Sequence, residues 1–176
     1  YSQACDGGDG GGCSGLAYQH ANGMGAAKDA AQVRKYSSMA CDLGELDSCA
    51  YLAEVYLKGS EVAANPSLAA GLLKRACDKG HKRSCGELGL LHFSGEGVRV
   101  SKRRAAELLA IACEGGEMFY CAGLASLNFS GEGVTRSIPK AAELYEKACS
   151  NKVPEGCIGL GDMYYNGHGR PVDYSK

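Results

Sequence analysis

The cysteines recur with a fixed period of 36 residues, and this period is the feature that most constrains the fold. They form five pairs, with seven residues between the two members: Cys5 and Cys13, Cys41 and Cys49, Cys77 and Cys85, Cys113 and Cys121, Cys149 and Cys157. All ten cysteines of the 176-residue chain belong to this frame. A sequence period of about 20 to 50 residues is typical of stacked repeats, in which each repeat buries its apolar face against its neighbours.

Within the period, the pattern predicts a helix, a tight glycine turn and a second helix. In the third repeat the first helix is expected from about Ser84 to Ser94, ended by Gly95 and Gly97, because glycine adopts left-handed dihedrals at little cost. The same turn positions hold Gly23 and Gly25, Gly131 and Gly133, Gly167 and Gly169, whereas the second repeat has Gly59 followed by Ser60 and Glu61. The second helix is expected to end at the first cysteine of each pair. Its start always has a residue type that caps helix N-termini: Asp29, Asn65, Ser101, Ser137 or Asp173.

One leucine position recurs in all five copies, and we call it the reference leucine: Leu16, Leu52, Leu88, Leu124 and Leu160. The next residue is always alanine or glycine, which lets two helices approach closely. We therefore predict an all-α fold, an α-solenoid of about five stacked helix-turn-helix repeats with a disulfide staple between successive repeats. The expected organisation is a single repeat domain, 1–176, with repeats at about 12–47, 48–83, 84–119, 120–155 and 156–176.

Charge and chain ends add two expectations. A net charge of −1 gives no general attraction to nucleic acid or anionic membranes, and no apolar run approaches the ~20 residues of a membrane helix. The chain opens on "YSQAC", which matches the end of a repeat, and closes on "VDYSK", which matches the start of a second helix. We expect a fragment cut in mid-repeat at both ends, with any export signal upstream.

Each cysteine pair joins the end of one second helix to the start of the next first helix. Antiparallel helices joined by a short loop bring such ends within the Cα–Cα window of about 4.4–6.8 Å that a disulfide requires. Structural zinc usually requires cysteines about two to four residues apart, and thioredoxin-like chemistry requires Cys-x-x-Cys. The spacing therefore favours a disulfide within each pair, and disulfides persist in oxidising compartments.

The stretches "LGLLHFSGEGV" (Leu88 to Val98) and "LGDMYYNGHG" (Leu160 to Gly169) resemble the Sel-1-like repeat family, relatives of the tetratricopeptide repeats. The cysteine pairs resemble its disulfide-rich branch, typified by the Helicobacter cysteine-rich proteins. The resemblance implies an exported scaffold for protein interactions, and for some members penicillin binding or weak β-lactam hydrolysis. The sequence departs from the family at its tyrosine position, where Tyr56 and Tyr164 are kept but His20, His92 and Asn128 replace it.

Candidate chemistry is weak. "SIPK" (Ser137 to Lys140) matches the Ser-x-x-Lys of class A β-lactamases, but Ser137 occupies the capping position and the partner motifs S-D-N and K-T-G are missing. "SGEGV" at Ser94 and Ser130 lacks the remainder of a phosphate loop. The histidines His20, His92, His81 and His168 have no recurring ligand partner, so we predict no metal site and no cofactor. The basic run around Arg83, Arg99 and Arg103 is either the solvated face of a helix or a surface for an acidic partner.

Helix geometry locates a candidate binding surface. The positions two before, two after, five after and six after the reference leucine are expected opposite the second helix, on the side that lines the groove of related arrays. Phe93, Phe129 and Tyr165 share one of these positions and predict an aromatic stripe, which either forms a groove or packs between repeats. The predicted binding residues are Tyr18, Asn22, Glu54, Lys58, Leu90, Phe93, Ser94, Ser126, Phe129, Ser130, Asp162, Tyr165 and Asn166, with Leu57 and Ile158 beside them.

These patterns favour a non-enzymatic, periplasmic or secreted scaffold that binds a protein or peptide, and not nucleic acid, through this groove. The alternative is a penicillin-binding, weakly β-lactam-hydrolysing or peptidoglycan-related protein that uses Ser137 and Lys140.

Overall fold

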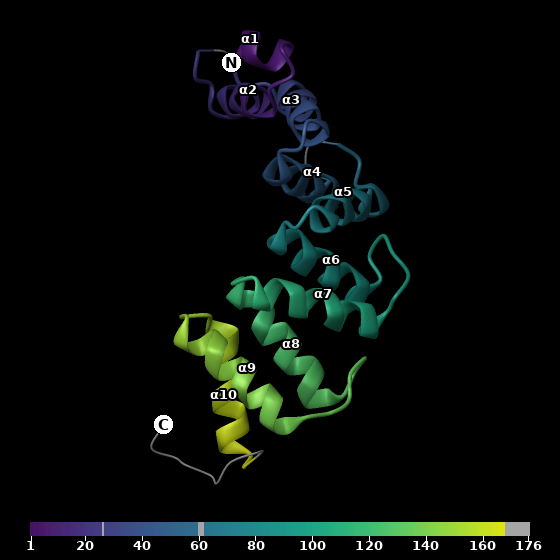
Figure 1. Cartoon of the computed structure of the whole chain (residues 1–176), viewed down its shortest axis with the longest axis vertical. Helices are drawn as coiled ribbons and strands as arrows, with labels where there is room; N and C mark the ends of the chain where they lie inside the picture. The colour runs from purple at the N-terminus through teal and green to yellow at the C-terminus, as the bar shows by residue number, and fades with distance from the viewer. Residues whose placement is uncertain (26, 60–61, 168–176) are drawn as a thin grey trace. The chain divides into compact units, whose positions relative to one another are not determined.

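The computed structural model is all-helical over the residues that it describes, 1–25, 27–59 and 62–167 (Figure 1). These residues form two compact units, which divide between residues 81 and 82. Unit 1 contains α1 (Ser2–Asp6), α2 (Gly10–Asn22), α3 (Ala30–Asp42), α4 (Leu46–Lys58) and α5 (Pro66–Asp78). Unit 2 contains α6 (Lys82–Ser94), α7 (Lys102–Glu114), α8 (Met118–Ser130), α9 (Ile138–Ser150) and α10 (Pro154–Tyr165). The α-solenoid prediction is confirmed; the boundaries of a single repeat domain stay a prediction.

The helix ends follow the predicted signals closely. Side chains of Asp29, Asn65, Ser101 and Ser137 accept hydrogen bonds from backbone N–H groups in the first turns of α3, α5, α7 and α9. Gly23, Gly59, Gly95 and Gly131 follow α2, α4, α6 and α8 with φ between 64° and 85°. Two boundaries differ from the expectation: α6 starts at Lys82 and not Ser84, and the second helices continue one residue beyond the cysteine. Gly169, His168 and Asp173 lie outside the described residues.

Helix packing within each repeat depends on the reference leucine and the small residue after it. Leu16, Leu52, Leu88 and Leu124 are buried, as are the alanines of the second helices, such as Ala105 and Ala141. At Gly89 a Cβ atom would lie only 3.2 Å from the Ala105 carbonyl oxygen and from Leu108, so the small residue sets the close approach of α6 and α7. In the fifth copy Leu160 is half-buried and Gly161 is exposed.

The disulfides form at the predicted pairs. Cys5–Cys13, Cys41–Cys49, Cys113–Cys121 and Cys149–Cys157 have Cα–Cα distances of 4.4–4.8 Å. Cys77 and Cys85 are also disulfide-bonded, so all ten cysteines of the chain are in disulfides. Each of the four measured bonds joins the end of a second helix to the following first helix.

A backbone hydrogen bond accompanies every junction. The alanine before each first cysteine accepts from the N–H five residues later, at 2.9–3.1 Å, in all five copies: Asp9 to Ala4, Glu45 to Ala40, His81 to Ala76, Glu117 to Ala112, Val153 to Ala148. The residue before each of these donors has positive φ. It is glycine at Gly8, Gly44, Gly80 and Gly116, but Lys152, with φ 63°, in the last copy.

Removing one staple tests its contribution to stability. The double variant Cys113→Ala, Cys121→Ala should lower the free energy of unfolding by at least about 2.5 kcal/mol, the chain-entropy contribution of so short a loop. Urea unfolding of oxidised protein measures it, and peptide mapping without reductant should return the five predicted pairs. A dominant disulfide between different pairs would contradict the staple interpretation.

Lys152 provides a second stability test. Lys152→Gly should raise the free energy of unfolding by about 1 kcal/mol, because a side chain disfavours the left-handed conformation that the junction requires. The reverse change, Gly116→Lys, is the matched control and should destabilise by a similar amount. A Cβ atom at Gly116 would meet nothing within 4 Å, so the control isolates the backbone effect. Urea unfolding measures both variants. Unchanged unfolding midpoints in both would refute the backbone explanation.

Candidate functional site

The predicted binding residues lie on the first helices α2, α4, α6, α8 and α10. All are exposed except Phe129, which is half-buried: Tyr18, Asn22, Glu54, Lys58, Leu90, Phe93, Ser94, Ser126, Ser130, Asp162, Tyr165 and Asn166. Of the two residues beside them, Ile158 is exposed and Leu57 half-buried. These residues therefore lie on the solvent-facing side of the first helices, while their role in binding stays a prediction.

One of the four predicted positions is wrong in two copies. Gly86 and Ala122, two residues before the reference leucine, are buried and not exposed. A Cβ atom on Gly86 would overlap the ring of Tyr120, so α8 of the next repeat packs against α6 here. Packing between neighbouring first helices covers Gly86, and Ala122 packs with Ala148 of the second helix α9. The register within one helix cannot show either contact.

Within unit 2, three predicted residues come together around one cavity. Phe129 of α8 and Asp162 and Asn166 at the end of α10 line a space of about 550 Å³, together with Tyr145, Gly159 and Met163. Phe129 also packs on the buried residues Ala141, Ala142 and Met163. The Phe129 ring therefore packs against the core on one side and lines the cavity on another. At this position the side chain does both things that were expected as alternatives, forming part of a hollow and packing between repeats.

A second cavity of about 240 Å³ in unit 2 includes two further predicted residues, Leu90 and Ser126. Its other walls include the aromatic rings of Phe119, Tyr120 and Tyr145. Burial raises the pKa of the Tyr120 hydroxyl to about 12, with the Glu87 carboxylate adding to the effect. Burial also raises the pKa of Tyr145, while a hydrogen bond with Ser126 opposes the shift. Both phenols are therefore neutral hydrogen-bonding groups at physiological pH.

The other two rings of the stripe differ in their surroundings. Phe93 is 39% exposed, and the Lys102 ammonium lies 3.1 Å from its ring centre. Tyr165 is 73% exposed. These two side chains are accessible to a partner, but their continuity with Phe129 as one surface stays a prediction.

The polar residues beside the stripe are engaged locally. The amides of Asn22 and Asn166 donate to the carbonyls of Tyr18 and Asp162, four residues earlier in each case. Lys58 forms an ion pair with Glu54. Ser94 and Ser130 accept from the backbone N–H of Glu96 and Glu132. These groups finish the C-terminal turns of the first helices, so part of their hydrogen-bonding capacity is already used.

Two of the three residues that replace the family tyrosine hydrogen-bond across the glycine turn. His20 Nδ1 lies 3.4 Å from the Ala27 carbonyl oxygen, and His92 Nδ1 lies 3.3 Å from that of Arg99. The Asn128 amide donates to the Leu124 carbonyl within its own helix. The side chains of His20 and His92 thus have structural hydrogen bonds. Over the part of the chain that the structure describes, no three potential metal-ligating side chains cluster.

Comparison with known proteins identifies the repeat. The model of the Sel1 repeat matches residues 12–45, 46–81, 83–117, 119–153 and 154–176. The chain belongs to the Sel1 repeat family. No curated protein matches the sequence.

Three solved structures are similar to this Sel1 repeat chain. The crystal structure of c5321, described as a protective antigen of uropathogenic Escherichia coli strains with an SLR fold, has a TM-score of 0.90 at 26% identity and covers 98% of the chain. The chain spans 37% of the length of that structure. A Sel1 repeat protein from Oxalobacter formigenes has a TM-score of 0.88 at 22% identity, covering 94% of this chain and 68% of its own. Helicobacter pylori cysteine rich protein B has a TM-score of 0.59 at 26% identity, covering 74% and 93%. The resemblance to the disulfide-rich branch is thereby confirmed.

The alternative catalytic residue Ser137 acts as a helix cap in this Sel1 repeat chain. Its hydroxyl accepts a hydrogen bond from the backbone N–H of Lys140 at 3.4 Å. Ser101 makes the equivalent bond to Arg104 at 3.2 Å. Neither the structure nor the comparisons support the β-lactam alternative for Ser137 and Lys140.

Part of the basic run pairs with neighbouring carboxylates. Arg83 pairs with Glu87 at 2.9 Å, and Arg103 and Arg104 both pair with Glu107. Hydrogen bonds from Arg104 and Arg103 lower the pKa of Glu107, so the carboxylate stays ionised. Such exposed pairs are typical of a solvated helix face, and a surface for an acidic partner stays a prediction.

Sequence patterns missed the side chains that close the cavities. Tyr145 of the second helix α9 lines the two cavities described above, and Phe119 and Tyr120 lie in the first turn of α8. Their only signal is a departure from the repeat: Tyr120 stands where the other copies have Gly12, Ser48, Ser84 and Gly156. A comparison of equivalent positions for unusually large residues would have identified Tyr120.

The capping role of Ser137 can be tested by two substitutions. Ser137→Asp should keep the free energy of unfolding, since aspartate also caps and its charge suits a helix N-terminus. Ser137→Val should lower it by about 1 kcal/mol in urea unfolding, as should the matched change Ser101→Val. A covalent β-lactam adduct on Ser137, detected by intact-mass spectrometry, would overturn this assignment.

Proposed function

We propose that the chain is a non-enzymatic scaffold that binds an extended peptide segment of a protein partner along the exposed side of its first helices. The observation that carries the proposal is the cavity of about 550 Å³ bounded by Phe129, Asp162 and Asn166. An aromatic ring beside a carboxylate and an amide suits a peptide, whose backbone N–H and C=O groups need partners and whose side chains need apolar contact. Sel1 repeats generally mediate protein interactions, which agrees with this assignment.

The proposed compartment is the periplasm or the extracellular space. All ten cysteines are disulfide-bonded, and such bonds persist in oxidising compartments. Within the described residues no helix combines the length and apolarity needed to cross a bilayer. Because a cytosolic redox environment would reduce the staples, the partner is expected among exported proteins.

The exposed rings Phe93 and Tyr165 give the test. Peptides selected from a random library on the oxidised chain should bind Phe93→Ala and Tyr165→Ala about 5- to 150-fold more weakly, the range of an anchor residue. Stability should change little, because both rings are already exposed. Isothermal titration calorimetry and urea unfolding measure the two quantities separately.

Two variants serve as controls. Ile111→Ala removes an exposed apolar side chain from the second helix α7 and should leave peptide affinity unchanged. Phe129→Ala should weaken binding and also lower the free energy of unfolding by about 2–3 kcal/mol, below the cost for a fully buried ring. Equal peptide affinity for wild type, Phe93→Ala and Tyr165→Ala would refute the groove.

A further inference from the structure

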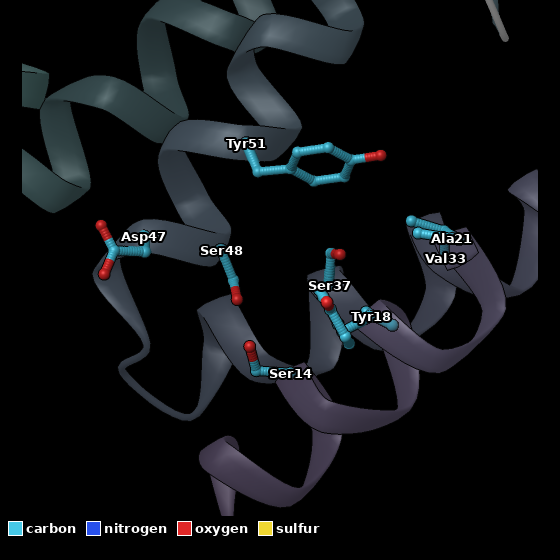
Figure 2. Close-up of a pocket in the computed structure, with 9 residues that line it drawn as sticks. Ser14, Tyr18, Ala21, Val33, Ser37, Asp47, Ser48 and Tyr51 are labelled. Atoms are coloured by element: carbon cyan, nitrogen blue, oxygen red, sulfur yellow. The ribbon is translucent and has the colours of Figure 1, made fainter. Parts of the chain in front are cut away.

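A cavity in unit 1 is lined by serine hydroxyls that have no hydrogen-bond partner among the described residues. It has a volume of about 240 Å³ and lies between α2, α3 and α4. Ser14, Ser37 and Ser48 contribute one hydroxyl from each helix, and Figure 2 shows those of Ser14 and Ser48 turned toward one another. The Tyr51 ring lies above them.

Two of these serine residues are largely buried. Ser37 is 3% exposed and Ser48 is 7% exposed. Their hydroxyl oxygens are not among the fully enclosed atoms that lack a partner, so the cavity leaves them accessible. A ligand that displaces water from such hydroxyls binds better when it replaces the hydrogen bonds of that water.

Ser37 gives this cavity a polar wall where later repeats have larger residues. Ser37 of α3 is equivalent to Leu73, Leu109 and Tyr145 of the later second helices. Leu109 lines the cavity of about 240 Å³ in unit 2 together with Leu90, Phe119 and Tyr120, which are equivalent to Tyr18, Asp47 and Ser48. The two cavities therefore lie at equivalent places in the repeat, and Ser37 supplies a hydroxyl where Leu109 supplies an apolar side chain.

The cavity is neutral and mostly apolar. Ala17, Ala21 and Val33 supply aliphatic wall, and Tyr18 and Tyr51 supply aromatic rings. The one ionisable carboxyl in the lining, Asp47, is turned away from the other side chains in Figure 2 and lies 3.1 Å from His81 Nε2. The interior therefore offers apolar contact, ring stacking and hydroxyl groups but no charge.

We propose that this cavity receives a phenol ring, the side chain of a tyrosine in a peptide partner. A phenol combines a flat apolar body with one hydroxyl that both donates and accepts, which matches apolar walls with serine hydroxyls at one side. The volume is below the range of about 300–1,000 Å³ for drug-sized ligands, which suits a single side chain. This proposal rests on peptide binding as the proposed function, because it names a residue that the peptide carries.

The first test uses small probes, so it does not depend on knowing the partner. The ¹⁵N-labelled chain with intact disulfides is titrated with p-cresol, toluene and p-toluate. We expect p-cresol to shift the amide signals of α2, α3 and α4 with a dissociation constant on the order of 1 mM. Toluene should bind about two- to tenfold more weakly because it lacks the hydroxyl, and p-toluate more weakly still because its charge would be desolvated.

Variants of Ser37 then separate space from hydrogen bonding. Ser37→Leu restores the residue type of the next two repeats and should weaken p-cresol binding at least about tenfold while raising the melting temperature. Ser37→Ala keeps the space and should remove the preference for p-cresol over toluene. Ser38→Leu makes the same change at an exposed neighbour on α3 and should leave binding unchanged.

Equal binding of p-cresol and toluene to the wild type would overturn the proposal, as would p-cresol binding that survives Ser37→Leu. If Ser37→Leu fails to fold, the ratio of the p-cresol and toluene dissociation constants in Ser37→Ala decides. A preference for p-cresol that persists in Ser37→Ala would then overturn the proposal. Phe93→Ala and Tyr165→Ala lie in unit 2 and should leave p-cresol binding intact, so failure of the groove and failure of this pocket are distinguishable.

The peptide part has its own readout. In peptides selected on the wild-type chain, replacing the tyrosine with phenylalanine should weaken binding about two- to tenfold, and this difference should vanish on Ser37→Ala. The assignment to a peptide side chain would be overturned if the selected peptides lacked tyrosine. It would also be overturned if peptide affinity were unaffected both by the change from tyrosine to phenylalanine and by Ser37→Ala.

Discussion

The junction between a second helix and the following first helix is the constraint on which the rest of the structure depends. At each of the four measured junctions a disulfide, a backbone hydrogen bond to an alanine carbonyl and a residue with positive φ act on the same short loop. Since a repeat of this kind contacts only its neighbours, the loop geometry decides which faces of adjacent repeats meet. The disulfide restricts the unfolded chain and the other two restrict the folded loop, so they act on different sides of the equilibrium.

Much of this architecture could be predicted from the sequence because its causes are local and recur every 36 residues. A capping side chain such as Asp29 or Ser101 acts within its own first turn, and a left-handed glycine such as Gly95 acts at one residue. The exposed side of the first helices follows from the helical period and one buried leucine. Errors arose where a neighbouring repeat intervenes: Gly86 is covered by the ring of Tyr120, which belongs to another helix.

The cavities could not be predicted in the same way, because each depends on side chains from at least three helices that belong to different repeats. Within α3, Ser37 has no feature that distinguishes it from other exposed or buried serines. It stands out only because it lines the same cavity as Ser14 of α2 and Ser48 of α4. Tyr145 likewise reaches cavities on both of its sides. The left-handed conformation of Lys152 was also missed. Glycine at the equivalent position of the other copies signals a positive φ, whereas lysine gives no such signal.

Positions at the junctions and positions around the cavities behave differently along this one chain. The junction cysteines and alanines are identical in every copy, whereas the position of Ser37 holds serine, leucine, leucine and tyrosine in successive repeats, and that of Asp47 holds aspartate, arginine, phenylalanine and glutamate. Along the first helices, equivalent exposed positions hold a recurring aromatic residue at Phe93, Phe129 and Tyr165 but change from Glu54 to Leu90 to Ser126. Under the proposed binding mode, discrimination between partners would therefore depend on the changing positions, because the recurring ones offer the same kind of contact in each repeat.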